Sequence, residues 1–229
     1  MSLKPKKKSD LKKIEEKMKV KASKMESMQH LPPYTMIVSE GIKTEPIYIK
    51  GLVNKVNEKY KNATRNPHIA VYGTGRNTQG LIRFVDSMIE QGKWNHYNKF
   101  WLMYDKDDFP LDNFDNTQFE AEARKKPQMA VAWSNESIEL WFLLYFEDYC
   151  SDNGRKQYIE KLNQYFDYSK KREDLYDILN SLGSQEEAKR RARKMYAEFV
   201  DAHVTSMSAM VPATRVFELV EELESYLEK

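Results

Sequence analysis

The chain has 229 residues, a length that suits one substantial α/β domain with a helical appendage. Its 41% hydrophobic and 12% aromatic residues exclude a wholly disordered protein, and its single cysteine, Cys150, excludes an internal disulfide framework and a cysteine-based zinc cluster. The net charge of +2 hides ten lysines and four acids within residues 1–26, a basic arm before an acidic remainder. Such an arm fits either a nucleic-acid-binding segment or a solvated tail.

Apolar runs in the sequence are too short to cross a membrane. The longest, LWFLLYF, falls well below the roughly 18 residues that a spanning helix needs, and acids flank it. We also find no signal-peptide pattern, and the cysteine usage suits a reducing compartment. We therefore expect a cytoplasmic protein without a membrane partner.

The predicted elements alternate along the first two thirds of the chain. TMIVSEG (35–41) reads as a strand, and the helix after it is expected to start with Thr44 as its N-cap. HIAVYG (68–73) is the next strand, GTGRNTQG (73–80) a turn and LIRFVDSMIEQG (81–92) a helix. NKFWLMYD (98–105) is a third strand, TQFEAEARKK (117–126) a helix, QMAVAWS (128–134) a fourth strand and NESIELWFLLYF (135–146) a helix.

Strands that alternate with helices predict an α/β fold with a parallel sheet flanked by helices. Strand signals disappear after about residue 151, and the remainder reads as four helices with breaks near Ser169, Gly183 and Pro212. We therefore divide the chain into a basic arm and linker (1–33), an α/β core (34–150) and a helical C-terminal part (151–229).

Acids follow two of the predicted strands. Glu40 ends the first strand, while Asp105 and Asp107 stand in WLMYDKDDFP (101–110) at the end of the third. The carboxyl ends of parallel strands share one edge of a sheet, so these acids are expected to meet there. A divalent cation such as Mg²⁺ would offset their repulsion. The alternative is a structural cluster neutralised by Lys43 or Lys106.

Further candidates follow the fourth strand. Glu136 and Glu139 are three residues apart, which places them on one face of the predicted helix. Glu136 suits the helix N-terminus as a capping charge. Glu139, amid apolar residues, either pairs with a basic side chain or joins the metal ligands.

Two other segments have the chemistry to bind phosphate. GTGRNTQG follows a strand and opens a helix, so Gly75 and Arg76 are candidate phosphate contacts; an ordinary tight turn is the competing interpretation. KRRARK (189–194) places Arg190 and Arg191 on a predicted helix, where they form either a phosphate-binding face or a solvated one.

Three blocks of the sequence carry a family resemblance. Glu-Gly after the first strand and Asp-x-Asp after the third resemble the Toprim domain of topoisomerases, primases and OLD-type nucleases. IVSEGIKTEPIYIKGL (37–52), WLMYDKDDF (101–109) and SNESIELWFLLYF (134–146) more specifically resemble the RloB-like (AbiLii-like) family of bacterial phage-defence proteins. The last block departs from the family pattern: Glu136 stands in place of a proline and Tyr145 in place of a histidine.

The resemblance implies a Toprim-like, Mg²⁺- or Mn²⁺-dependent nuclease that hydrolyses a phosphodiester of DNA or RNA and acts in abortive infection with an AAA/SMC-like ATPase. Glu40 then matches the general acid/base or a metal ligand, and Asp105 and Asp107 match the metal-binding pair, with Glu139 as a further ligand. The residues expected to contact the substrate are Lys43, Gly75, Arg76, Asn135, Arg190 and Arg191. Alternatives are a catalytically weak module that docks the ATPase or nucleic acid, and a nucleotide-handling transferase that uses the glycine turn.

Overall fold

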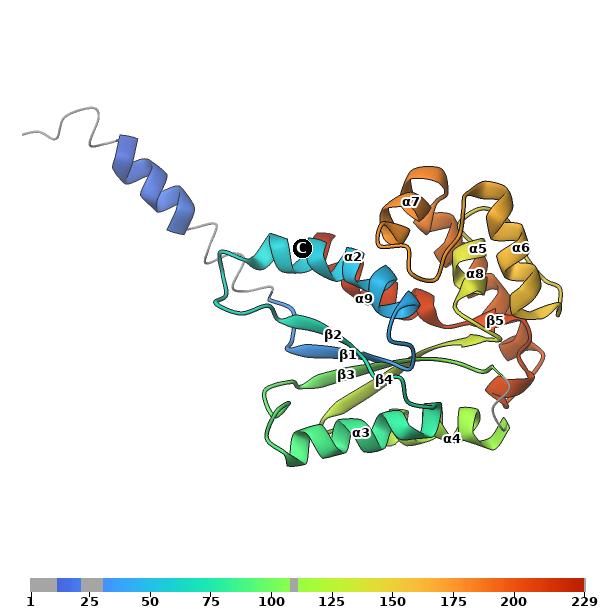
Figure 1. The fold of residues 1–229 in the computed structure, drawn as a ribbon. Coiled ribbons are helices and arrows are strands. Elements are labelled where there is room, and N and C mark those ends of the chain that lie inside the picture. Colours follow the sequence, from blue (N-terminus) through green and yellow to red (C-terminus); the bar gives the residue numbers. More distant parts are fainter. Residues whose placement is uncertain (1–11, 22–30, 108–110, 229) are drawn as a thin grey trace, which may run out of the picture.

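The structure is a computed structural model that describes residues 12–21, 31–107 and 111–228. Its centre is a five-stranded sheet with the order β2-β1-β3-β4-β5, in which the first four strands are parallel and β5 runs antiparallel to β4 (Figure 1). The strands are β1 (Thr35–Ser39), β2 (Ile69–Gly73), β3 (Lys99–Asp105), β4 (Gln128–Asn135) and β5 (Ala213–Thr214). The predicted parallel sheet is thereby confirmed.

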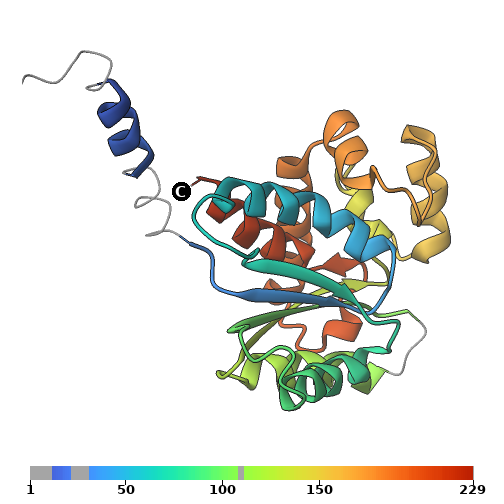
Figure 2. The same ribbon diagram turned by 60° about the vertical axis from the view of Figure 1, so that its left-hand side comes forward.

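Helices cover both faces of this sheet. α2 and α9 lie side by side on one face, while α3 and α4 lie together on the other, as two views agree (Figures 1 and 2). The helices α5 to α8 gather beyond the carboxyl ends of the strands (Figure 1). The helices are α2 (Thr44–Tyr60), α3 (Thr78–Glu90), α4 (Leu111–Ala123), α5 (Glu139–Leu143), α6 (Gly154–Tyr165), α7 (Leu175–Leu182), α8 (Gln185–Asp201) and α9 (Val216–Glu228), with a 3₁₀ turn at Met207–Ala209.

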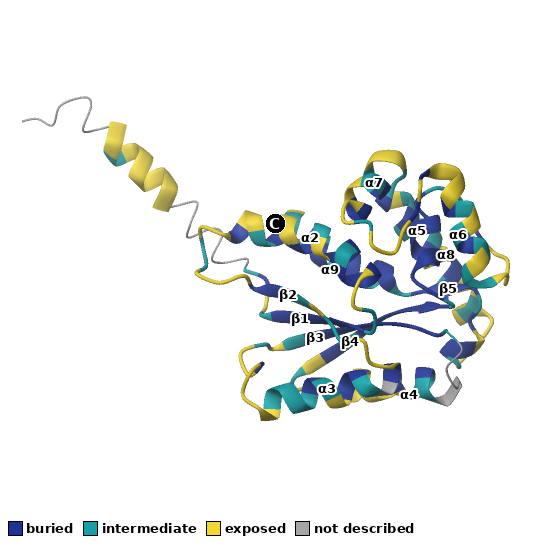
Figure 3. Cartoon of the chain, viewed as in Figure 1, coloured by how far each residue is buried: buried dark blue, intermediate teal, exposed yellow. Residues whose placement is uncertain are grey.

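The central strands are buried on both sides, which explains their apolar sequences. All five residues of β1 are buried, and so are six of the seven residues of β3 (Figure 3). A strand covered by helices on both faces has no solvent side, so its residues need not alternate between apolar and polar. The run FWLMY in β3 is therefore the expected sequence of a central strand.

The C-terminal part is helical, as predicted, and the breaks between its helices fall near the three expected positions. Its last segment returns to the sheet, where α9 packs beside α2 and β5 pairs with β4. β5 was not predicted from the sequence, because two residues are too few to show a strand pattern. α7 packs on α2 at Gly51, where a Cβ atom would lie 2.3 Å from the ring of Tyr176.

Several boundaries differ from the predictions. α4 begins at Leu111 and not in TQFEAEARKK, and α5 covers only Glu139–Leu143. Glu136 therefore precedes the helix, so the expectation that Glu136 and Glu139 share a helical face is wrong. Thr44 is the first residue of α2 and not its N-cap; the N-cap position is Lys43, and the Thr44 hydroxyl donates to the Lys170 carbonyl instead.

The expectation for the basic arm falls mostly outside the described residues. Residues 12–21 form a helix, whereas 1–11 and 22–30 belong to the parts that the structure does not describe. Within the described ranges, none of the helices has both the length and the apolar character that a membrane crossing requires.

Candidate functional site

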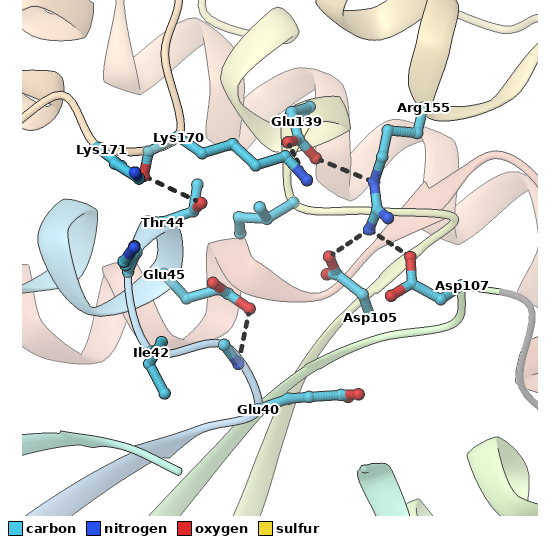
Figure 4. Close-up of a pocket in the computed structure, with 13 residues that line it drawn as sticks. Glu40, Ile42, Thr44, Glu45, Asp105, Asp107, Glu139, Arg155, Lys170 and Lys171 are labelled. Atoms are coloured by element: carbon cyan, nitrogen blue, oxygen red, sulfur yellow. Dashed lines mark hydrogen bonds and ion pairs between the residues drawn. The ribbon is translucent and has the colours of Figure 1, made fainter. Parts of the chain in front are cut away.

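A pocket of about 420 Å³ opens at the carboxyl edge of the sheet. Its walls come from the β1–α2 loop, the end of β3, the segment into α5, the start of α6 and the segment before α7. Figure 4 shows acidic side chains from the first three of these facing basic ones from the last two. The lining residues are Glu40, Gly41, Ile42, Lys43, Thr44, Glu45, Asp105, Asp107, Ile138, Glu139, Arg155, Lys170 and Lys171.

Strand register brings the predicted acids together. Ser39 pairs with Met103, and the Glu40 N–H donates to the Met103 carbonyl at 2.8 Å, so Glu40 leaves β1 beside the last residues of β3. Asp105 is the final residue of β3 and its side chain is buried. The expectation that both strand ends face one cavity agrees with this arrangement.

Glu40 has a carboxyl group that titrates near neutral pH. Burial raises its pKa from the ordinary 4.5 to about 7, the hydrogen bond from Thr78 Oγ1 (3.1 Å) opposes this rise, and the charges of Asp107 and Glu45 add to it. A carboxyl with a pKa near 7 exchanges a proton readily at physiological pH. Glu40 thus has the property that a general acid or base needs.

Glu45 is a buried acid that the sequence analysis did not select. It lies in the first turn of α2, and its Oε1 accepts from the Gly41 N–H at 3.1 Å. A Cβ atom on Gly41 would lie 2.2 Å from Glu45 Oε2, so a larger residue here would displace the Glu45 carboxylate. Burial raises the pKa of Glu45, and repulsion from Glu139 adds to the rise.

Asp105 and Asp107 share one cation, Arg155 of α6. Arg155 Nη2 lies 3.2 Å from Asp105 Oδ2 and also pairs with Asp107 Oδ1, and Arg155 Nε lies 3.6 Å from Glu139 Oε2 (Figure 4). Burial and the charges of Glu45 and Glu139 still hold the pKa of Asp105 well above its usual range, although Arg155 lowers it. One guanidinium therefore leaves the acids incompletely compensated.

The cation beside these acids differs from the two that the sequence suggested. Lys43 lines the pocket, while Lys106 Nζ donates to the Asp107 carbonyl at 3.2 Å. The ion pairs to Asp105 and Asp107 come from Arg155, fifty positions along the chain. Sequence reasoning had no signal for Arg155, because only the packing of α6 against α5 brings it to the strand ends.

Glu139 is the most deeply buried acid of the pocket, with 1% of its surface exposed. Its Oε1 accepts from the Tyr168 hydroxyl at 2.9 Å and lies 3.7 Å from Lys170 Nζ, while Oε2 has no hydrogen-bond partner among the described residues. The expected pairing with a basic side chain is confirmed by Lys170 and Arg155, and the oxygen without a hydrogen bond leaves the other option, a metal ligand, open as well.

Glu136 has a different role from the one expected. Its Oε2 accepts from the Arg155 backbone N–H at 3.4 Å, and its own carbonyl accepts from the Asp107 N–H at 3.1 Å. Glu136 therefore accepts a hydrogen bond from a backbone N–H at the N-terminus of α6 and not at that of α5. In doing so it fixes the starting point of the helix that carries Arg155.

The donor chemistry of the pocket suits a hard divalent cation, since Glu40, Asp105, Asp107 and Glu139 all offer carboxylate oxygens. An orphaned, buried oxygen of Glu139 supports the fit. Over the described ranges, no three His, Cys, Asp or Glu side chains converge tightly enough to hold a metal in the present arrangement. Arg155 lies where Asp105 and Asp107 would share such an ion.

The remaining predicted substrate contacts lie outside this pocket. Gly75 and Arg76 are in the turn before α3, where Arg76 stacks on the ring of Phe84. Asn135 donates to the carbonyls of Met207 and Ser208. Their substrate-binding role stays a prediction.

The cations of KRRARK lie on α8 and make ion pairs there and with neighbouring segments. Arg190 pairs with Glu187, and Arg191 donates to the Leu144 carbonyl at 2.7 Å and lies 3.8 Å from Asp148. The Arg191 contacts join α8 to the end of α5, and the phosphate-binding role of Arg190 and Arg191 stays a prediction.

Tyr145, which replaces the histidine of the resembled pattern, is buried away from the pocket. Its hydroxyl contacts the Tyr48 hydroxyl at 2.8 Å and donates to Gln185 Oε1 at 3.0 Å. The tyrosine thus joins α2 to α8 through the core.

Comparisons with known proteins agree with the sequence resemblance. A family model described as "RloB-like protein" matches residues 35–223, which include every strand and all the pocket-lining residues. Searches of the curated proteins and of the solved structures found no match. Since the family model covers well over half of the chain, the protein belongs to the RloB-like family.

Proposed function

We propose that the protein is a metal-dependent nuclease that hydrolyses phosphodiester bonds at the pocket on the carboxyl edge of the sheet. The observation that carries this proposal is the excess of buried acid there: the pKa values of Glu40, Glu45 and Asp105 are all raised despite the nearby guanidinium. A cation that binds beside such carboxyl groups stabilises their charged form, so the pocket favours binding of a further cation. The sheet is consistent with a Toprim-like fold, which is part of the same proposal.

The residues divide into two groups by charge. Glu40, Asp105 and Asp107, with Glu139 beside them, would hold Mg²⁺ or Mn²⁺, which when bound supplies a Lewis acid that acidifies water and stabilises charge on a phosphate. Lys43, Lys170 and Lys171 line the same pocket and suit the oxygens of a phosphodiester. Glu40, with a pKa of about 7, can accept a proton from the attacking water.

The direct test is metal-dependent cleavage of single- and double-stranded DNA and of RNA. We expect the wild-type protein to cleave at least one of these with Mg²⁺ or Mn²⁺ and not with EDTA. Asp105→Asn should abolish cleavage, whereas Asp201→Asn, the same change at an exposed position of α8, should not. Equal cleavage by the two variants would overturn the proposal.

Membership of the RloB-like family supports a proposal about the biological role of the protein, for which the described residues themselves hold no contact. We propose that the nuclease acts in the bacterial cytoplasm, in phage defence, under the control of an AAA/SMC-like ATPase. Cells that carry both proteins should resist phage, and the Asp105→Asn variant should remove that resistance. Resistance that survives the substitution would refute the link between this site and defence.

One observation favours a second candidate, a catalytically weak module that docks the ATPase or nucleic acid. Arg155 already bridges Asp105 and Asp107, as a structural ion cluster would. A docking module should keep its partner binding after Asp105→Asn and show no metal-dependent cleavage. The cleavage experiment therefore separates the two candidates.

A further inference from the structure

Arg155 contacts three of the four carboxylates that the proposed metal site needs. Its Nη2 lies 3.2 Å from Asp105 Oδ2 and pairs with Asp107, and its Nε lies 3.6 Å from Glu139 Oε2. We propose that Arg155 is an internal cation that competes with the divalent metal, so that metal binds only when the guanidinium leaves Asp105 and Asp107. This inference rests on the proposed metal site and adds its regulation.

The competition follows from charge and space. A guanidinium in contact with both aspartates uses the oxygens that Mg²⁺ would coordinate, and Mg²⁺ demands a close, near-octahedral shell. Two cations at one pair of carboxylates also repel each other strongly where water is scarce. The two partners are therefore mutually exclusive at Asp105 and Asp107.

Glu139 is a further carboxylate of the pocket that needs a cation beside it. It is 1% exposed, faces the pocket (Figure 4), and its Oε2 has no hydrogen-bond partner among the described residues. A buried carboxylate oxygen without a hydrogen bond is costly, and in the present arrangement Arg155 Nε, 3.6 Å away, offsets its charge. When Arg155 leaves, Tyr168 and Lys170 still contact Oε1, so the charge keeps partial compensation.

The side chain of Arg155 can move without its helix. Glu136 accepts from the Arg155 N–H, and Gly154 adopts a φ of 73°, where a Cβ atom would lie 2.5 Å from Glu136 Oε2. These contacts fix the backbone at the start of α6. The long side chain is 29% exposed, so it can turn toward the pocket mouth, where a substrate phosphate would offer a new bidentate partner.

Calorimetric titration with Mn²⁺ and Mg²⁺ tests the competition directly. We compare wild type with Arg155→Gln, which removes the charge, Arg155→Lys, which keeps it, and Arg193→Gln, a matched change on α8 that breaks the pair with Glu221. Loss of the competing charge should tighten Mn²⁺ binding by about tenfold or more in Arg155→Gln. Arg155→Lys and Arg193→Gln should stay near the wild-type affinity.

The outcomes separate this inference from the proposed function. If wild type binds metal and Arg155→Gln binds it equally or more weakly, the competition is refuted while the metal site stands. If neither protein binds metal at millimolar concentration, the metal site and the competition both fail.

A second measurement on the wild type remains decisive if Arg155→Gln does not fold. The Nε–Hε signal of Arg155 in ¹⁵N–¹H NMR is assigned by its loss in Arg155→Lys. Saturating Mg²⁺ should shift this signal toward that of a solvated arginine. A signal unchanged by bound Mg²⁺ would show that the guanidinium keeps its position, against the proposal.

Discussion

Substitution of Glu40 by glutamine should make the metal-free protein more stable at alkaline pH and leave it unchanged at acidic pH. Burial raises the pKa of Glu40 from 4.5 to about 7, so the folded protein holds a proton that the unfolded chain releases. Between these two values the unfolded state binds fewer protons, and the free energy of unfolding falls as pH rises. Glutamine has no charge to bury and still accepts from Thr78.

The size of the effect follows from the same pKa values. A rise from 4.5 to about 7 corresponds to roughly 3 kcal/mol if fully expressed. Partial exposure of Glu40 to solvent reduces this to about 1 to 2 kcal/mol. The stability difference between Glu40→Gln and wild type should therefore be near zero at pH 4.5, grow up to pH 7 and reach about 1 to 2 kcal/mol at pH 8.

Urea unfolding in EDTA at pH 4.5, 6 and 8 measures this difference. The other raised acids, Glu45 and Asp105, contribute to both proteins, so the comparison isolates Glu40. Glu90→Gln, at the exposed end of α3, is the matched control and should follow wild type at every pH. A Glu40→Gln protein no more stable than wild type at pH 8 would refute the burial argument.

Two further predictions concern the packing around the pocket. Gly51→Ala should destabilise the protein by about 1 to 3 kcal/mol in urea unfolding, because the new Cβ would lie 2.3 Å from the ring and 2.4 Å from the Cβ atom of Tyr176. The added cost should vanish in a Tyr176→Gly background, which removes both groups, and its persistence there would contradict the clash. Tyr168→Phe should lower the free energy of unfolding by about 1.5 to 3 kcal/mol in the same assay, because it removes the 2.9 Å hydrogen bond to the buried Glu139 carboxylate. A decrease below about 0.5 kcal/mol would show that this bond contributes little.

The parts of the site that lie at strand ends were predictable from sequence. Burial on both faces makes β1 and β3 mainly apolar runs, so the end of each strand can be located in the sequence. The acids Glu40 and Asp105 occur at these ends. Parallel pairing then places those ends at one edge without further information. Glu45 was also accessible to this reasoning, because the first turn of the next helix begins at the same edge.

The contacts made by the helical part were not predictable from sequence. Arg155 and Tyr168 reach the acids only through the packing of α6 and the segment after it, and no spacing along the chain records that packing. Glu136 was misplaced because the apolar run after it reads as one long helix, whereas α5 is a short turn of Glu139–Leu143. The apolar content of this segment predicts that it is buried, but it does not predict where the helix begins and ends.

The most direct test of the metal site is Mn²⁺ titration of wild type and of an Asp105→Asn/Asp107→Asn double variant, by calorimetry and thermal unfolding, with circular dichroism to confirm that the variant folds. We predict saturable binding and a higher melting temperature with metal for the wild type alone. Binding by neither protein, or equal binding by both, would contradict the assignment of these aspartates as metal ligands.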